Sequence, residues 1–202
     1  YCCSNSANSI FWWIKCEYQF SSKYVGFNFA RFSDSYSNHF QKDIIVNSNI
    51  LINVYYPFGG GGIESMITNL SVEARDSGIK SCLIIIGVEL GKVNETNFDK
   101  VTLIKDGLTG KQLAQALQFQ CQIIEHEQQG KAKILIHTPG LWAYFFRLSN
   151  VECVIHSIPT LITSQRGIKA KIRKWMMARV YQKHKMVAVS EGVAFDLIQK
   201  FH

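Results

Sequence analysis

The sequence is poor in proline, poor in charge and free of long hydrophobic runs. It has 202 residues, of which only three are proline and 18% are charged, while 47% are hydrophobic. Such a composition supports a buried core, so we expect neither a disordered chain nor a collagen-like repeat. The longest apolar run, residues 82–88, has the length of a strand and falls far short of the roughly 20 residues of a membrane-spanning helix. We therefore expect one large folded domain or two small ones.

Sequence patterns typical of disulfide frameworks and metal sites are also missing. Three of the six cysteines, Cys82, Cys121 and Cys153, lie singly in apolar stretches, where cysteine packs as a small hydrophobe. The others, Cys2, Cys3 and Cys16, lack the CxxC or histidine spacing of a zinc site. No secretory signal pattern is present. We expect a cytoplasmic chain without a resident metal or cofactor.

Acidic residues are absent from one basic segment. Between residues 166 and 185 the chain has no Asp or Glu, and without this segment 14 basic residues face 15 acidic ones. The net charge of +7 is therefore a property of one segment and not of the whole chain. Its eight basic residues are Arg166, Lys169, Lys171, Arg173, Lys174, Arg179, Lys183 and Lys185.

The first 48 residues lack a regular hydrophobic period. Residues 1–45 hold 12 of the 25 aromatic residues, scattered among Ser and Asn. Only residues 27–32 alternate for a few positions and could pair as a strand. We interpret residues 1–48 as an irregular extension that precedes one domain, residues 49–202.

From residue 49 onward, continuous apolar strands alternate with helices. The expected strands cover residues 50–55, 80–87, 98–104, 133–137, 151–156 and 186–190. The expected helices cover residues 63–76, 109–129, 141–148, 166–183 and 192–201. Strands without polar alternation are typical of a parallel sheet that is covered on both faces. The predicted fold class is α/β, with a Rossmann-like parallel sheet and helices on both faces.

Glycines, histidines and a hydroxyl follow the ends of these strands. The glycine run 59–62 follows the first, His137 ends the fourth, His156 ends the fifth, and Ser190 and Glu191 follow the sixth. In parallel sheets of this class, ligands bind outside the carboxyl ends of the strands. We therefore expect these residues to share one binding edge.

The glycine run between a strand and a helix allows backbone N–H groups to approach an anion. No Gly-Lys-Ser/Thr follows it, so it is not a P-loop, and Glu64 stands where a dinucleotide fingerprint needs its third glycine. Glu89, after the second expected strand, could still bind a ribose. A nicotinamide-dinucleotide domain and a turn without a ligand both remain alternatives.

The two histidines suit either a structural or a catalytic role. No cysteine nucleophile or Gly-x-Ser-x-Gly elbow accompanies them, so the sequence gives no support for a hydrolase. His126-Glu127 lacks the second histidine of a zinc protease, and no Asp-x-Asp motif for a metal-held sugar nucleotide occurs.

Four motifs follow the ends of the expected strands in a fixed order. They are Phe58-Gly-Gly-Gly-Gly-Ile-Glu64, Ile134-Leu-Ile-His137, Val154-Ile-His156 and Val187-Ala-Val-Ser-Glu-Gly-Val193 with Asp196-Leu197. Together they resemble the N-terminal half of a GT-B glycosyltransferase of the retaining family 4. Lys133 stands where that family often has Asp or Asn, and Ser157 stands where it usually has Asp or Gly. They span residues 49–202, and residues 1–48 match nothing in the family.

The resemblance implies transfer of a sugar from a nucleotide-sugar donor to a saccharide or lipid-linked acceptor, with retention and without a metal, as in polysaccharide or glycolipid biosynthesis. It implies that His156 contacts the transferred sugar near its reacting centre. The residues implied to bind donor or acceptor are Gly60, Gly61, Gly62, Glu64, His137, Ser190 and Glu191.

The family takes its catalytic cations and a Glu-x7-Glu motif from a C-terminal domain that this sequence does not include. Cations placed where charge develops stabilise the departing diphosphate. We therefore expect the 202 residues to form one half of a GT-B fold and to have no transferase activity alone.

The basic segment predicts an amphipathic helix. Ile168, Ile172, Trp175 or Met176, and Val180 form its apolar stripe. Such a helix can lie on anionic lipid, which would make the protein peripheral on the inner face of the membrane. The residues expected to face that membrane are Lys169, Arg173, Lys174 and Trp175. A helix packed on the core with a solvated basic face explains the pattern equally well.

Two further interpretations of the whole chain stay open. One is a nicotinamide-dinucleotide domain, and the other is a non-catalytic Rossmann-like module that binds a membrane or a partner through the basic helix. We do not expect nucleic acid as a partner, because no aromatic stacking platform accompanies the charge.

Overall fold

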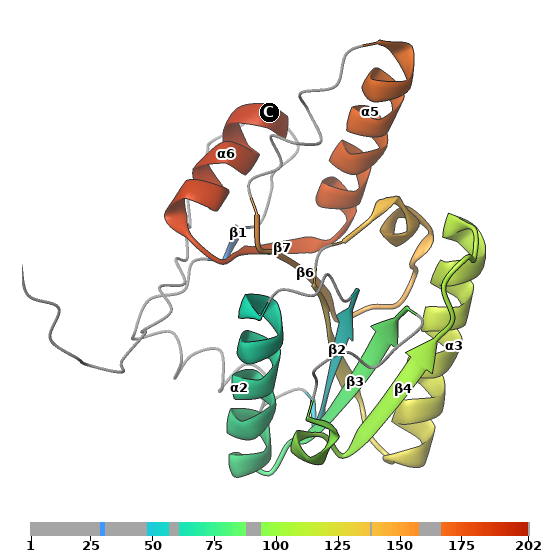
Figure 1. Cartoon of the computed structure of the whole chain (residues 1–202), viewed down its shortest axis with the longest axis vertical. Helices are drawn as coiled ribbons and strands as arrows, with labels where there is room; N and C mark the ends of the chain where they lie inside the picture. Colours follow the sequence, from blue (N-terminus) through green and yellow to red (C-terminus); the bar gives the residue numbers. More distant parts are fainter. Residues whose placement is uncertain are drawn as a thin grey trace, which may run out of the picture.

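The structure is a computed structural model and describes residues 29–30, 48–56, 61–87, 94–137, 139–157 and 167–201. Its centre is a parallel sheet with helices on both faces (Figure 1). The Rossmann-like α/β fold that the sequence predicts is confirmed. The structure does not test the boundary at residue 48 between extension and domain, which stays a prediction.

All strand pairs of the sheet are parallel, and the strand order is β1-β7-β6-β5-β2-β3-β4. From β2 the chain moves outward through β3 to β4, and it then crosses back to place β5 on the other side of β2. The point where the direction reverses, between β2 and β5, is where sheets of this class open a crevice for ligands. The strands are β1 (Phe29–Ala30), β2 (Ile50–Tyr55), β3 (Lys80–Ile86), β4 (Lys100–Ile104), β5 (Ala132–His137), β6 (Val151–Ile155) and β7 (Lys185–Ala188).

All six strands expected between residues 49 and 202 are present, with ends shifted by up to two residues. β1 lies within the alternating stretch 27–32 and pairs with β7. Two residues of the predicted irregular extension therefore belong to the sheet.

The helices begin and end close to the expected positions, with one exception. Residues 141–148, expected to form a short α-helix, instead form the 3-10 helix η2 (Leu141–Phe145). Short segments of a single turn gain few i→i+4 hydrogen bonds and often adopt the tighter helix. The other expected helices are α2 (Gly62–Asp76), α3 (Gly110–Glu127), α5 (Ile168–Lys183) and α6 (Glu191–Phe201), and the 3-10 helix η1 (Glu95–Asn97) was not predicted.

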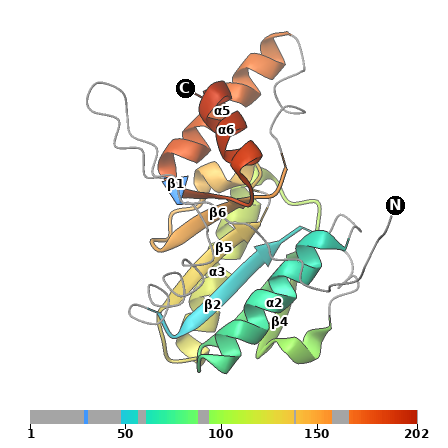
Figure 2. The ribbon, with the colours of Figure 1, turned by 90° about the vertical axis from the view of Figure 1, so that its left-hand side faces the viewer.

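The alternation of side chains along each strand divides the core into two layers. Ile50, Ile52 and Val54 of β2 pack in the larger cluster, which also holds most of the buried residues of α3 and α5. Leu51 and Tyr55 point to the other face, where α2 packs. Figure 2 shows α2 in front of the sheet and α3 behind it. Because both faces are covered, β2 is buried along its whole length.

Three cysteines confirm the expectation that they pack as buried hydrophobes. Cys82, Cys121 and Cys153 are buried and free, and burial raises the pKa of the Cys82 thiol to about 11. In the part of the chain that the structure describes, no helix has the length and hydropathy needed to cross a bilayer.

Candidate functional site

Two histidines meet at the carboxyl edge of the sheet. His137 is the last residue of β5, and His156 directly follows β6. The strands are in register with His137 opposite Val154, so His156 lies two residues further along on the same face. Nδ1 of His137 lies 3.0 Å from Nε2 of His156. The structure therefore brings together the two histidines that the sequence placed at this edge.

A buried asparagine extends this pair into a row of three. Asn53, in the middle of β2, has no exposed surface, and its Oδ1 lies 3.0 Å from Nε2 of His137. In the register, Asn53 of β2 lies opposite Leu135 of β5. His137 follows Leu135 by two residues and therefore lies on the same face, one step nearer to the carboxyl edge. The three side chains thus rise diagonally across β2, β5 and β6, starting at the point where the strand order reverses.

Asn53 was not predicted as a site residue, because the apolar pattern of β2 predicts only a buried strand. A signal was nevertheless present. A polar amide in the centre of a fully buried strand needs a hydrogen-bond partner, and the partner must come from a neighbouring strand or from a ligand.

Both histidines are neutral at physiological pH. Burial lowers the pKa of His137 well below its usual value, and the neighbouring His156 lowers it further. Burial also lowers the pKa of His156, to about 4. The site therefore offers neutral ring nitrogens that exchange hydrogen bonds, and it does not offer a positive charge.

The glycine-rich loop lies partly outside the described residues, and Gly60 is among those not described. Gly61 adopts a φ of 33°, and Gly62 begins α2. A Cβ at either position would meet no heavy atom within 4 Å. Among the described residues nothing crowds the N-terminus of α2, and the N–H groups of a first helical turn favour an anion.

Glu64, expected to bind donor or acceptor, contacts the sheet, and its binding role stays a prediction. Its Oε1 accepts a hydrogen bond from the hydroxyl of Tyr55 at the end of β2. Its Oε2 is buried and has no hydrogen-bond partner among the described residues. This contact fixes the first turn of α2 against β2, and it does not join Glu64 to the histidine pair.

Ser190 and Glu191 lie at the start of α6. Oγ of Ser190 accepts a hydrogen bond from the backbone N–H of Val193 at 3.3 Å, which makes Ser190 the N-terminal cap of the helix. Glu191 is the first residue of α6. The cap is a structural role for Ser190, and its predicted role in substrate binding remains untested.

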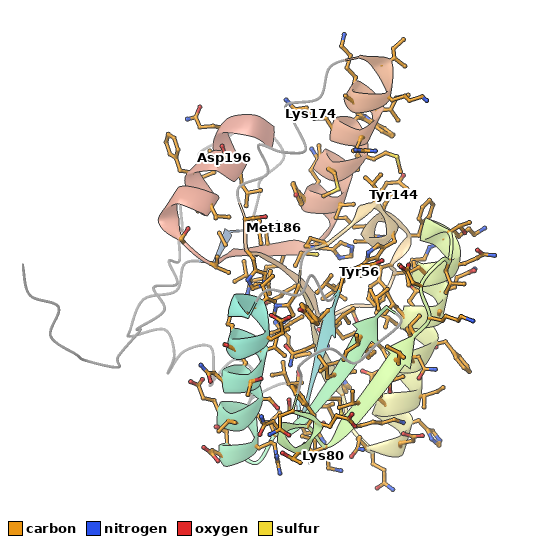
Figure 3. The ribbon with its side chains drawn as sticks, in the orientation of Figure 1. Tyr56, Lys80, Tyr144, Lys174, Met186 and Asp196 are labelled. Carbon is orange, nitrogen blue, oxygen red and sulfur yellow. The ribbon has the colours of Figure 1, made fainter. Side chains whose placement is uncertain are left out.

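A second polar pair at the same edge was not predicted. Tyr56, just beyond β2, donates a hydrogen bond from its hydroxyl to Oδ2 of Asp106, at 2.8 Å. Figure 3 shows Tyr56 at the carboxyl end of β2. The bond to Asp106 raises the pKa of Tyr56, and the same bond lowers the pKa of Asp106. Asp106 gave no sequence signal, because it follows an edge strand outside the apolar pattern.

The residues expected to face a membrane lie on a helix that extends beyond the sheet (Figure 1). Lys169, Arg173, Lys174 and Trp175 are all exposed. The apolar stripe is only partly as expected. Ile168 and Ile172 are 77% and 55% exposed, whereas Val180 is fully buried. Val180 lies more than two turns beyond Ile172, where α5 already packs on the sheet.

The C-terminal half of α5 is attached to η2 through backbone carbonyls. Nζ of Lys183 donates to the carbonyl oxygens of Tyr144 and Phe146, at 2.8 and 2.5 Å. Beside this contact lies a surface hollow of about 500 Å³. Its lining residues are Tyr144, Trp175, Arg179, Gln182 and Lys183.

Within the described ranges, no group of three or more histidine, cysteine or acidic side chains is arranged to hold a metal ion. No protein-family model matches the chain, and neither the curated proteins nor the solved structures contain a significant match.

Proposed function

We infer that this chain forms the acceptor-side half of a GT-B glycosyltransferase of the retaining type. In this proposal it takes part in moving a sugar from a nucleotide-sugar donor to a saccharide or lipid-linked acceptor. The observation that carries the proposal is the contact between His137 and His156 at the carboxyl edge of the sheet. Both belong to the motifs through which the sequence resembles that family.

The chemistry of this edge suits an uncharged, hydroxyl-rich ligand next to an anionic one. Neutral imidazoles at His137 and His156 can exchange hydrogen bonds with sugar hydroxyls. The N-terminus of α2, which follows β2, carries a partial positive charge that favours a diphosphate. A nucleotide-sugar combines these two groups in one molecule.

Stabilisation of the departing diphosphate needs cations placed where charge develops. The described edge supplies neutral imidazoles and a helix N-terminus, and no cation among the described site residues contacts them. We therefore propose that this edge contributes substrate binding, and that no resident cofactor or metal takes part.

The test is a titration with nucleotide sugars, monitored by NMR on protein with 15N-labelled histidine. We expect millimolar UDP-glucose or GDP-mannose to shift the ring resonances of His156, and His156→Ala to weaken binding at least tenfold. His126→Ala is the matched control, because His126 is exposed near the end of α3. Binding of NAD or NADP in place of nucleotide sugars would instead support the dinucleotide alternative. No binding of either class would support a non-catalytic module.

A second candidate function is attachment to an anionic membrane surface through α5. The observation that favours it is one helix face on which Ile168, Ile172 and Trp175 are 77%, 55% and 54% exposed. These positions follow a spacing of four and three residues and therefore share one face. The buried residues of α5 lie on the opposite face, at Ala170, Met177, Val180 and Tyr181.

Cations flank this apolar face without a single acid. Lys169, Lys171 and Lys174 are exposed, and the segment 166–185 contains no Asp or Glu. In the view of Figure 3, Lys174 lies on the flank of α5 nearer to α6, and Tyr144 lies at the opposite flank. Apolar side chains between cations complement a bilayer with anionic headgroups, where Trp175 would lie at headgroup level.

The hollow beside this face suits a phosphate headgroup. The guanidinium of Arg179 lies over the ring of Trp175, 5.4 Å from its centre, and both line the hollow. An arginine held in this way keeps its charge and can form two parallel hydrogen bonds to a phosphate. In this proposal the protein is peripheral on the inner leaflet.

Sedimentation with vesicles tests this candidate. We expect binding to vesicles that contain phosphatidylglycerol and none to pure phosphatidylcholine, with loss of binding in the triple variant Lys169→Glu, Arg173→Glu, Lys174→Glu. The matched control reverses three exposed lysines away from α5, Lys105, Lys111 and Lys131, and so changes the net charge equally. Equal loss in both triple variants would show that net charge, and not α5, causes the binding.

A further inference from the structure

The contacts along the row of Asn53, His137 and His156 determine which atoms donate a proton and which accept one. Each contact is 3.0 Å long, one from Asn53 to His137 and one from His137 to His156. The remaining ring nitrogen of His156, Nδ1, has no hydrogen-bond partner among the described residues. Asn53 therefore stands at the buried end of the row, and Nδ1 of His156 stands at its open end.

The chemistry of each atom fixes where the protons lie. Oδ1 of Asn53 is a carbonyl oxygen and can only accept, so Nε2 of His137 carries a proton and donates it. A neutral His137 then has a bare Nδ1, which must accept from Nε2–H of His156. A neutral His156 with its proton on Nε2 has a bare Nδ1.

Neutrality of both rings is a condition for this assignment. A doubly protonated His137 would donate from both nitrogens. Nε2 of His156 would then have to accept, and the proton of a neutral His156 would be on Nδ1. Burial removes that state, because it lowers the pKa of both rings, that of His156 to about 4. One neutral tautomer of His156 then remains.

We propose that Asn53 is a positioning residue that fixes the tautomer of His156, so that Nδ1 of His156 accepts a hydrogen bond from a hydroxyl group of the sugar substrate. The tautomer follows from the free protein. The identity of the ligand hydroxyl as part of a sugar rests on the proposed function.

The burial of Asn53 supports a role beyond stability. Its side chain is fully buried, and its Nδ2 has no hydrogen-bond partner among the described residues. An unsatisfied buried amide lowers stability, whereas an apolar side chain of similar size would fill the same place in the strand without this cost. The hydrogen bond that Oδ1 of Asn53 accepts from His137 explains why this position holds a polar residue.

This direction also selects the ligand. A bare ring nitrogen accepts from a hydroxyl or an amine, and it repels the lone pairs of a phosphate or a carboxylate oxygen. His156 therefore suits the hydroxyl-bearing part of a substrate and not its diphosphate, which leaves the N-terminus of α2 for the anion.

The tautomer can be measured directly by long-range 1H–15N NMR on ligand-free protein at pH 7. Protonated and bare ring nitrogens resonate far apart, so we expect a protonated Nε2 and a bare Nδ1 at His156. Asn53→Leu and Asn53→Val remove the carbonyl, and we expect either to produce a mixture of the two tautomers at His156. Two apolar replacements of different shape guard against a failure of one to fold.

Val54→Ala is the matched control, because Val54 neighbours Asn53 in β2 but points to the opposite face. It should lower stability and leave the tautomer unchanged. A His156 with its proton on Nδ1 in the wild-type protein would overturn the proposal, since the amide of Asn53 would then donate. An unchanged single tautomer in both Asn53 variants would overturn it as well.

The ligand part has its own test, with nucleotide sugars that lack one hydroxyl at a time. We expect one deoxy analogue to bind wild-type protein about tenfold more weakly, and the Asn53 variants to lose this discrimination. If no nucleotide sugar binds, the proposed function fails while the NMR result on the tautomer stands. If sugars bind but no deoxy analogue is discriminated, the ligand part fails alone.

Discussion

The carboxylate of Glu152 in β6 lies 2.5 Å from the amino group of Lys133 in β5, and it is 3% exposed. It also lies 2.8 Å from the amino group of Lys185, at the start of β7. This network lies at the amino ends of the strands, opposite the edge that holds the histidines. The ion pair with Glu152 gives Lys133 a structural role in joining β5 to β6.

Glu152→Ala should lower the free energy of unfolding by about 3 kcal/mol, because it leaves the half-buried Lys133 without its partner. The matched control is Glu127→Ala, which breaks the exposed pair with Lys100 and should cost less than about 1 kcal/mol. Urea unfolding followed by circular dichroism measures both. Equal losses in the two variants would contradict a special role for Glu152.

Gly61→Ala should destabilise the protein by about 1 kcal/mol, because residue 61 has a φ of 33°, where an L side chain is strained. Gly62→Ala is the control. Residue 62 is in the first turn of α2 without a positive φ, so alanine should leave stability unchanged or raise it slightly. Thermal unfolding of the two variants measures the difference, and a Gly61→Ala variant as stable as wild type would contradict the prediction.

Stability should fall as the pH is lowered from about 6.5 towards 4. The folded-state pKa of His137, His156 and His184 is depressed, mainly by burial, and that of His156 lies at about 4. Below about pH 6.5 the unfolded chain therefore binds more protons than the folded one, and each such histidine removes up to about 1.4 kcal/mol per pH unit.

Urea midpoints between pH 7.5 and 4.5 measure this loss. Carboxylates also titrate in this range, so the informative quantity is the difference in slope between wild type and His156→Gln. A variant that retains the wild-type slope would show that His156 is not protonated on unfolding.

Asp106→Asn should lower the pKa of Tyr56 back towards 10, because the hydrogen bond to Asp106 is the largest cause of its increase. Ultraviolet absorbance of tyrosinate measures the titration of all tyrosines together. The part of the titration curve that is lost in Tyr56→Phe belongs to Tyr56. An unchanged titration in Asp106→Asn would contradict the hydrogen bond between the two side chains.

The strands were predictable because their apolar runs are continuous, as in the run at residues 82–88, which contains most of β3. The histidine pair was predictable for the same reason, since strand ends fix the positions of His137 and His156 at one edge. Asn53 was not, because its role depends on the strand order, which places β5 beside β2 and not beside β4. Periodicity along one segment carries no information about that order.

Helix α5 shows a second limit of the sequence. The sequence pattern predicts one apolar stripe along this helix, but Val180 packs on the core while Ile168 and Ile172 are exposed. The difference arises because only the second half of the helix lies against the sheet. How far a helix extends past its support is a tertiary property.

The pairing of β1 with β7 joins residues 29–30 to residues 186–187, from opposite ends of the chain. Closing so long a loop costs more entropy than any other pairing in this sheet, and parallel strands at such separation form slowly. β1 has only two residues and lies at the edge. We therefore expect this strand to pair last during folding and to exchange its amide protons first in the native state, so that β7 alternates between an inner strand and an open edge.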